Sequence, residues 1–257
     1  MLKRREFNCL QPDWNPIEFL ICLNGSIRYM ALSIILIISM LPAAQGIDKK
    51  PSSEEAQFDI YVAGKGIGRE KFSILFSADS ASSSSILDFS NPGSKPQNMH
   101  IETQLDMDSR FLPRTYQLRT DIDGQKGILK GTFTPGQAIF AYGGSGNPRK
   151  GGLLVGDQYS ILDTNIFHHF VFIARLFNFD SKEKLQSFEV VVPQEMDNGI
   201  IKISEVGMER TQVRAGKKNL HHLKADSGSL VIDLWVDDQR ILYKIALPSK
   251  KIEVIRN

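Results

Sequence analysis

Alternation of apolar and polar residues with a period of two runs through most of the chain after residue 57, and it limits the fold more than any other feature. Phe58, Ile60 and Val62 occupy alternate positions. Further runs of this kind cover residues 72–76, 98–107, 112–121, 125–134, 137–143, 185–192, 200–206, 230–236 and 241–247. Because successive side chains of a strand point to opposite faces, each run predicts a strand with one buried face. Turn signals recur at roughly the spacing typical of antiparallel meanders, not of βαβ units.

One segment departs from this alternation. Residues 163–179 are too long for a strand, and a helical period places most of their polar side chains on one side. The remaining surface is largely aromatic and includes Phe167, Phe170 and Phe177. Asp163 is the expected N-cap, since its carboxylate could accept hydrogen bonds from the first helical turn. The sequence therefore predicts a mainly β fold: a single antiparallel, strongly curved sheet or open barrel, with one amphipathic helix at about 163–178 packed on it.

Two segments have the composition of flexible loops, namely the serine-rich residues 77–85 and the glycine-rich residues 143–152. The glycines at 64, 66 and 68 follow a strand, as the glycines of a dinucleotide-binding loop would. Residues 69–76 continue as a strand, whereas a dinucleotide site needs a helix at that place. We therefore interpret residues 63–66 as a hairpin turn.

The N-terminal 46 residues have the features of an export signal. An apolar run at residues 31–41 follows four basic residues, and small residues at Ala44 and Gly46 predict cleavage before Ile47. The leader is long, and Met30 is an alternative start. An uncleaved anchor built from residues 17–41 is the other interpretation. The predicted organisation is a signal peptide at 1–46, a flexible segment at 47–56 and a single β-rich domain at 57–257, in a periplasmic or extracellular location.

Charge and cysteine content change when the leader is set apart. Both cysteines, Cys9 and Cys22, lie in it, and removing its four basic and three acidic residues leaves 27 basic against 26 acidic residues. A nearly neutral chain lacks the electrostatic footprint of a nucleic-acid-binding protein, so we expect no nucleic acid partner. Contact with a membrane is expected only through the N-terminal export segment.

No motif in the sequence predicts catalysis, a metal site or a cofactor. Residues 143–147 resemble a nucleophile elbow, but the last glycine is replaced by Asn147 and no helix follows. The histidines occur as His100 and the pairs 168–169 and 221–222, and adjacent histidines diverge on both helices and strands. A solvated or capping role is the simpler interpretation for all of them. If one of them has a function, we select His168, which shares a helix face with Arg175.

Several patches resemble a group of uncharacterised exported bacterial proteins, β-rich periplasmic proteins that are described only as a domain of unknown function. They are residues 58–70, 112–116, 162–165, 234–240 and 252–256. The group's usual turn glycine is replaced here by Asp238 and Gln239. The resemblance implies a β-rich fold and no defined activity. A looser similarity, in architecture alone, is to the half-barrel lipoprotein carriers LolA and LolB.

The leading hypothesis for function is an extracytoplasmic, non-enzymatic binding or carrier protein for an apolar or lipid-like ligand. Its candidate ligand-binding residues are Phe167, Phe170, Phe177, His168 and Arg175, because apolar sites often lie at the mouths of curved sheets. The phenylalanines could equally be plain core. The alternatives are a structural or protein-interaction module with an envelope protein as partner, and an enzyme using His168 with a carboxylate from a facing strand.

Overall fold

The computed structural model describes residues 52–91, 97–144 and 148–257. These residues form one fifteen-stranded sheet, one α-helix and a short 3-10 helix. The elements are β1 (Ser52–Val62), β2 (Lys65–Phe76), β3 (Ser80–Asn91), β4 (Gln97–Asp108), β5 (Pro113–Ile122), β6 (Gln125–Thr134), β7 (Gln137–Gly144), β8 (Arg149–Leu154), β9 (Tyr159–Ile161), α1 (His169–Leu176), β10 (Leu185–Val192), β11 (Asp197–Val213), β12 (Gly216–Asp226), β13 (Val231–Val236), β14 (Leu242–Leu247), η1 (Pro248–Lys250) and β15 (Ile252–Arg256).

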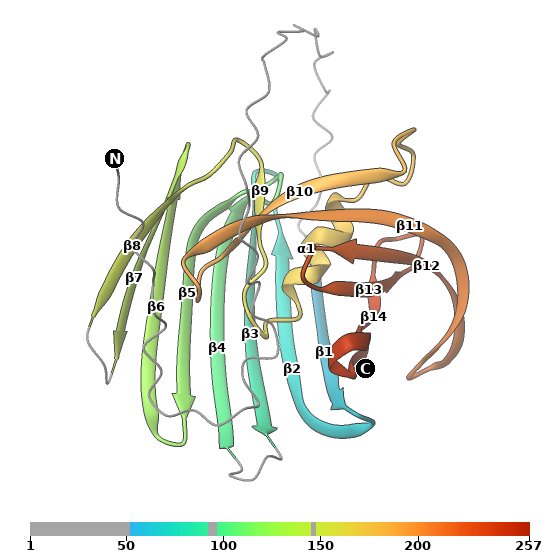
Figure 1. Cartoon of the computed structure of the whole chain (residues 1–257), viewed down its shortest axis with the longest axis horizontal. Coiled ribbons are helices and arrows are strands. Elements are labelled where there is room, and N and C mark those ends of the chain that lie inside the picture. The colour runs from blue at the N-terminus through green and yellow to red at the C-terminus, as the bar shows by residue number, and fades with distance from the viewer. Residues whose placement is uncertain (1–51, 92–96, 145–147) are drawn as a thin grey trace, which may run out of the picture.

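The sheet is curved and open, as the sequence predicts. Its strand order runs from β8 through β1 and then, by way of β15, to β9, and the two end strands are not paired with each other. All neighbouring strands are antiparallel except β9, which runs parallel to β10. Figure 1 shows β1–β7 as one wall and β10–β14 folding across it, with α1 between the two.

The middle of the sheet joins segments from opposite ends of the chain. β1 pairs with β15, and Ile60 lies opposite Val254. The Asn257 N–H also donates to the Gln57 carbonyl, at 2.8 Å. This pairing connects the two walls, because β15 is the only bridge in the strand order between β1 and β14.

The period-two pattern matches the buried face of the sheet. Phe58 and Ile60 in β1, and Ile74 in β2, are fully buried in the main hydrophobic core. α1 packs into the same core through Phe170 and Phe172. The core therefore lies on the concave face, between the two walls and around the helix.

Tight turns have the residues that their backbone angles require. Ala63 and Gly64 connect β1 to β2 with φ of 47° and 78°, so the glycine-containing segment is a hairpin turn, as interpreted from the sequence. Between β13 and β14, Arg240 has a φ of 63° in place of the usual glycine. The Asp237 carboxylate there accepts hydrogen bonds from the N–H groups of Gln239 and Ile241, which stabilise the turn without a glycine.

The helix is shorter than predicted and begins differently. α1 covers only His169–Leu176, and its N-cap residue is His168, whose side chain makes no capping hydrogen bond. The expectation of an N-cap at Asp163 is therefore wrong. Residues 163–168 form turns whose buried groups bond to the sheet, and those bonds replace helical ones. The prediction that the aromatic face packs against the sheet is confirmed.

Most of the serine-rich segment is a strand, contrary to prediction, and only residues 77–79 form the expected loop. β3 begins at Ser80 and is paired on both sides, by β2 and β4. Ser83 and Ser85 point into the core, and the Ser85 and Thr103 hydroxyls lie 2.8 Å apart. Pairing on both edges thus outweighs a composition typical of loops, and the small side chains leave room for the segment before α1.

Two other expected flexible segments are shorter than predicted. β1 starts at Ser52, so residues 52–56 belong to a strand, whereas residues 47–51 lie outside the described residues. In the glycine-rich segment, β7 extends to Gly144 and β8 begins at Arg149. Residues 145–147, which include most of the elbow-like motif, and the export segment at 1–46 also lie outside the described residues.

The left-handed backbone of Ala63 leads to a prediction. We expect Ala63→Gly to raise the free energy of unfolding by about 0.5–1 kcal/mol, because glycine adopts a positive φ without the steric cost of a Cβ atom. Ala141→Gly, within β7, should instead lower it by a similar amount. Urea denaturation of both variants measures the difference, and equal effects would contradict the argument.

Candidate functional site

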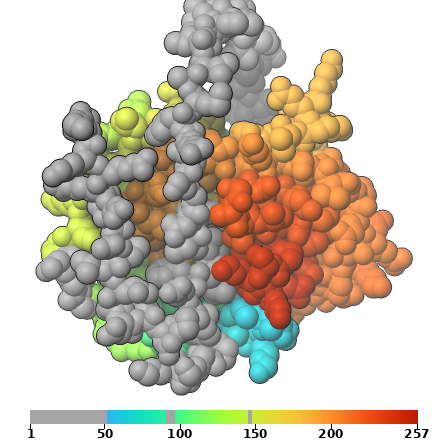
Figure 2. All heavy atoms as spheres, in the orientation of Figure 1, coloured from blue at the N-terminus to red at the C-terminus, as the bar shows by residue number. Residues whose placement is uncertain are grey.

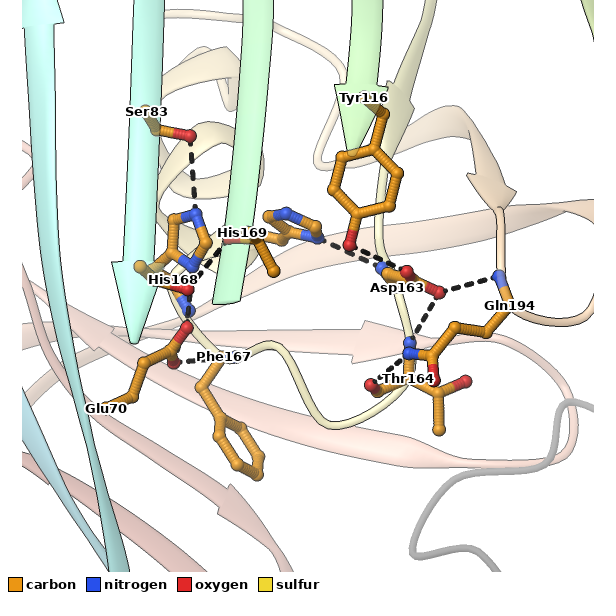
Figure 3. Close-up of polar contacts among 11 residues, drawn as sticks. Glu70, Ser83, Tyr116, Asp163, Thr164, Phe167, His168, His169 and Gln194 are labelled. Atoms are coloured by element: carbon orange, nitrogen blue, oxygen red, sulfur yellow. Dashed lines mark hydrogen bonds and ion pairs between the residues drawn. The ribbon is translucent and has the colours of Figure 1, made fainter. Parts of the chain in front are cut away.

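A cluster of buried polar side chains surrounds the segment that leads into α1. Glu70 comes from β2, Ser83 from β3 and Tyr116 from β5, and they meet residues 163–169 (Figure 3). The Glu70, His168 and His169 side chains are fully buried. Since buried charged groups are rare unless they are paired, this cluster is the candidate functional site.

The Glu70 carboxylate holds the start of the helix. Its Oε2 atom accepts hydrogen bonds from the N–H groups of Phe167 and His168, each at 3.0 Å. Its Oε1 atom lies 2.6 Å from Nδ1 of His168. Glu70 thus supplies, from a neighbouring strand, the negative charge and the acceptor that a helix N-terminus favours.

Ser83 extends this pair into a line of three residues. Its hydroxyl lies 3.3 Å from Nε2 of His168, so serine, histidine and carboxylate follow one another as in a hydrolase triad. Ser83 is only 5% exposed and His168 is fully buried, so a substrate has no access to either group in this conformation. Phe72 is stacked on the His168 ring, with centroids 5.7 Å apart. The geometry is that of a packed structural network.

Asp163 organises a second part of the cluster. Its Oδ2 atom accepts a hydrogen bond from the Tyr116 hydroxyl at 2.8 Å, and its Oδ1 atom accepts from the N–H groups of Thr164 and Gln194. Burial raises the pKa of Asp163 to about 6, although these hydrogen bonds act in the opposite direction. Burial and the nearby Asp163 charge hold the pKa of Tyr116 well above 10.

His169 is kept neutral between these two parts. Its Nδ1 atom accepts a hydrogen bond from the Asp163 N–H at 3.1 Å, so the proton of the neutral ring is on Nε2. Burial, together with the charge of the neighbouring His168, holds the pKa of His169 well below 6.5. Within the described residues, Nε2 has no hydrogen-bond partner although it is buried.

The residues predicted as ligand-binding occupy three different environments. Phe167, Phe170 and Phe177 are at most 2% exposed and belong to the core. His168 lies in the polar cluster. Arg175 instead forms an ion pair with Glu54, stacks over the Phe76 ring and is not among the contacts of His168. His168 and Arg175, selected from the sequence for their shared helix face, each contact a different carboxylate, Glu70 and Glu54.

Sequence reasoning missed Glu70, Ser83 and Tyr116 as members of the site. Glu70 could have been identified from the sequence, because it occupies the same alternate, inward-facing positions of β2 as Phe72 and Ile74. Ser83 has the same relation to Leu87 in β3. A polar residue at an inward position of a strand indicates a buried partner, although it does not identify that partner.

The remaining histidines are paired with carboxylates nearer the surface. His221 contacts Glu205 and Asp238, and these hydrogen bonds raise its pKa although partial burial acts against them. His222 contacts Asp233 and is stacked on the Trp235 ring. Among the described residues, no group of three or more histidine, cysteine, aspartate or glutamate side chains is arranged to hold a metal ion.

A small apolar cavity of about 20 Å³ lies beside the entry to α1, lined in part by Phe170, Val190 and Ile201. Its volume is close to that of one water molecule, so the chain's own side chains fill the space beside the entry to α1. In the portion of the chain covered by the structure, no helix combines the length and the apolar character needed to cross a bilayer.

Comparison with solved structures confirms the fold. A β-barrel-like protein of domain of unknown function DUF1849 from Brucella abortus superposes with a TM-score of 0.52 at 9% identity, over 79% of this chain and 94% of that one. A DUF1089 family protein from Pseudomonas aeruginosa covers 70% of this chain and 90% of its own, at 11% identity and a TM-score of 0.44. No family model and no curated protein matches the sequence. The expected resemblance to a β-rich domain of unknown function is thus confirmed for the fold. The similarity to the Brucella abortus protein is the observation that supports it.

The Glu70 contacts lead to a prediction about stability. Glu70→Ala should lower the free energy of unfolding by about 3–5 kcal/mol, because His168 and two N–H groups lose their partner inside the core. Glu70→Gln should cost less, since its amide oxygen can still accept hydrogen bonds from both N–H groups. Urea denaturation compares the two variants. Equal losses would show that the hydrogen bonds of Glu70 are not what stabilises the helix entry.

The buried Asp163 leads to a prediction about pH. Between pH 3.8 and about 6 the native state keeps a proton on Asp163 that the unfolded chain releases, so the free energy of unfolding falls as pH rises through this window. Asp163→Asn removes that dependence. As pH rises from 3.8 to about 6, the free energy of unfolding of Asp163→Asn should therefore increase relative to that of the wild type by roughly 2–3 kcal/mol. Above this window the difference between the two proteins should be constant.

Denaturation at a series of pH values measures this difference directly. Asp157→Asn, at an exposed aspartate, is the matched control and should show no such trend. A constant difference between Asp163→Asn and the wild type at all pH values would contradict the argument.

Proposed function

We propose that this chain is a non-enzymatic binding or carrier protein of the cell envelope, exported by its N-terminal segment, which takes an apolar or lipid-like ligand on the concave face of its sheet. The observation that carries the proposal is the position of α1. This helix of eight residues lies between the two walls of the open, curved sheet and packs aromatic side chains against its concave face. Concave apolar surfaces in curved sheets are common sites for apolar ligands.

The filled interior implies how a ligand would bind. The cavity of about 20 Å³ beside the helix is far too small for an acyl chain, so α1 has to move for the ligand to enter. An eight-residue helix is unstable in isolation, and its start depends on contacts with Glu70. A ligand that enters would therefore have to displace the segment 163–178 together with its bonds to Glu70 and Tyr116.

A second candidate function is a structural or protein-interaction module of the cell envelope. The closely packed interior favours it, since such a module requires no space for a ligand. An enzyme using His168 is the least supported alternative because that side chain has no access to solvent.

Uptake of a fluorescent fatty acid distinguishes the candidates. Delipidated protein should increase the fluorescence of cis-parinaric acid, and Phe170→Ala should increase it further, because the change enlarges the space beside α1. Ile139→Ala is the control, at an outward position that is 48% exposed. If neither the wild type nor Phe170→Ala takes up the probe, the carrier function is wrong and the interaction module is favoured.

Mass spectrometry of protein purified from its native envelope extends this test. We expect a mature chain that begins at Ile47 and a lipid that is released by organic extraction. A chain that retains residues 17–41 would favour the membrane anchor, and a chain without lipid would count against the carrier function.

A further inference from the structure

The longest strand of the sheet is paired along only part of one edge. β11 has 17 residues, and β10 pairs with it only from Asp197 to Ser204. β12 continues along the other edge as far as Val213. Within the described residues, 205–213 have no strand on the β10 side. Figure 1 shows this part of β11 and β12 at the margin of the molecule, and the corresponding orange atoms lie at the right-hand margin of Figure 2.

Contacts on the other side hold this hairpin in place. Val213 and Leu220 pack with Trp235 in a small second core. The Trp235 indole N–H donates to Glu209 at 3.0 Å, and Arg214 forms an ion pair with Asp59 of β1. The free edge is therefore part of a rigid element, and its main-chain groups are already oriented to receive another strand.

A β-bulge determines which side chains share a face at this edge. The register shifts between Glu205 and Gly207, so Glu205 lies opposite Leu223, Met208 opposite His221, and Arg210 opposite Asn219. Residues 219, 221 and 223 alternate along β12 and share one face. Glu205, Met208 and Arg210 consequently point to that same face. Met208 is 58% exposed and the bulge residue Val206 is 59% exposed.

This arrangement is complementary to itself under a two-fold rotation. When two copies of the edge pair antiparallel with Met208 on the axis, Arg210 of each copy comes opposite the bulge residue Val206 of the other, next to Glu205. Glu205 uses its Oε1 atom to accept from His221, and its Oε2 atom can accept from the incoming arginine. The apolar Met208 side chains meet at the centre, between two ion pairs of opposite orientation.

We propose that residues 205–213 are a self-association surface through which two copies of this chain join their sheets edge to edge. The interface is isologous, as closed dimers require. It is independent of any ligand on the concave face, because the edge lies beyond the core that contains α1. The partner is a second copy because the charges of this edge complement those of the same edge.

A cysteine on the axis tests the geometry. In a full-length background with Cys9→Ser and Cys22→Ser, Met208→Cys places two thiols at directly opposed positions, where the Cα separation of an antiparallel pair suits a disulfide. Mild oxidation should convert the protein to a disulfide-linked dimer. Leu154→Cys, which is 84% exposed on β8, is the control and should form far less of it.

Sedimentation of the same chain without cysteine tests the charges. We expect a reversible monomer–dimer equilibrium, at least tenfold weaker in Arg210→Glu and recovered when Glu205→Lys is added to that variant. Arg114→Glu, at an exposed position of β5, should leave it unchanged. A chain that stays monomeric, or that dimerises equally with Arg210→Glu and Arg114→Glu, overturns the proposal, as does equal crosslinking through residues 208 and 154.

Discussion

The entry to α1 depends on the burial of one carboxylate, that of Glu70. Removing a charged carboxylate from water costs several kcal/mol, and this cost is offset only when its oxygens are fully hydrogen-bonded. Glu70 meets that condition with two backbone N–H groups and the His168 ring. The same bonds compensate for a helix that has no side-chain cap of its own. A strand and a helix that are nearly a hundred residues apart in sequence are thereby coupled through a single group.

Much of the strand pattern was predictable, because alternation responds directly to the burial of one face. Phe58, Ile60 and Ile74 are inward as predicted. The serine-rich strand β3 was not predictable, because its conformation comes from pairing with β2 and β4 and not from its own composition. The prediction of where the helix starts was wrong for a similar reason. Asp163 has a suitable residue type for an N-cap, but bonds to Tyr116 and Gln194 hold it elsewhere.

The candidate site was only partly accessible to the same reasoning. His168 was selected because it lies on the polar face of the predicted helix. Its partner Glu70 lies in β2, and the curvature of the whole sheet brings that strand close to the helix entry. No local pattern in the sequence specifies that curvature. The aromatic residues of α1 could be assigned to burial but not to a choice between core and ligand contact. Both roles place the same side chains on the same concave surface, where only a cavity of about 20 Å³ remains.

The pairing of β1 with β15 has a consequence for how the chain folds. The two strands are separated by almost the whole described chain, yet they join the two walls at the middle of the sheet. During synthesis from the N-terminus, one edge of β1 must stay open until residues 252–256 emerge. Closing so long a loop is slow, and an unpaired central strand is prone to aggregate. Folding of this chain would therefore benefit from a chaperone that covers β1 until its C-terminal partner arrives.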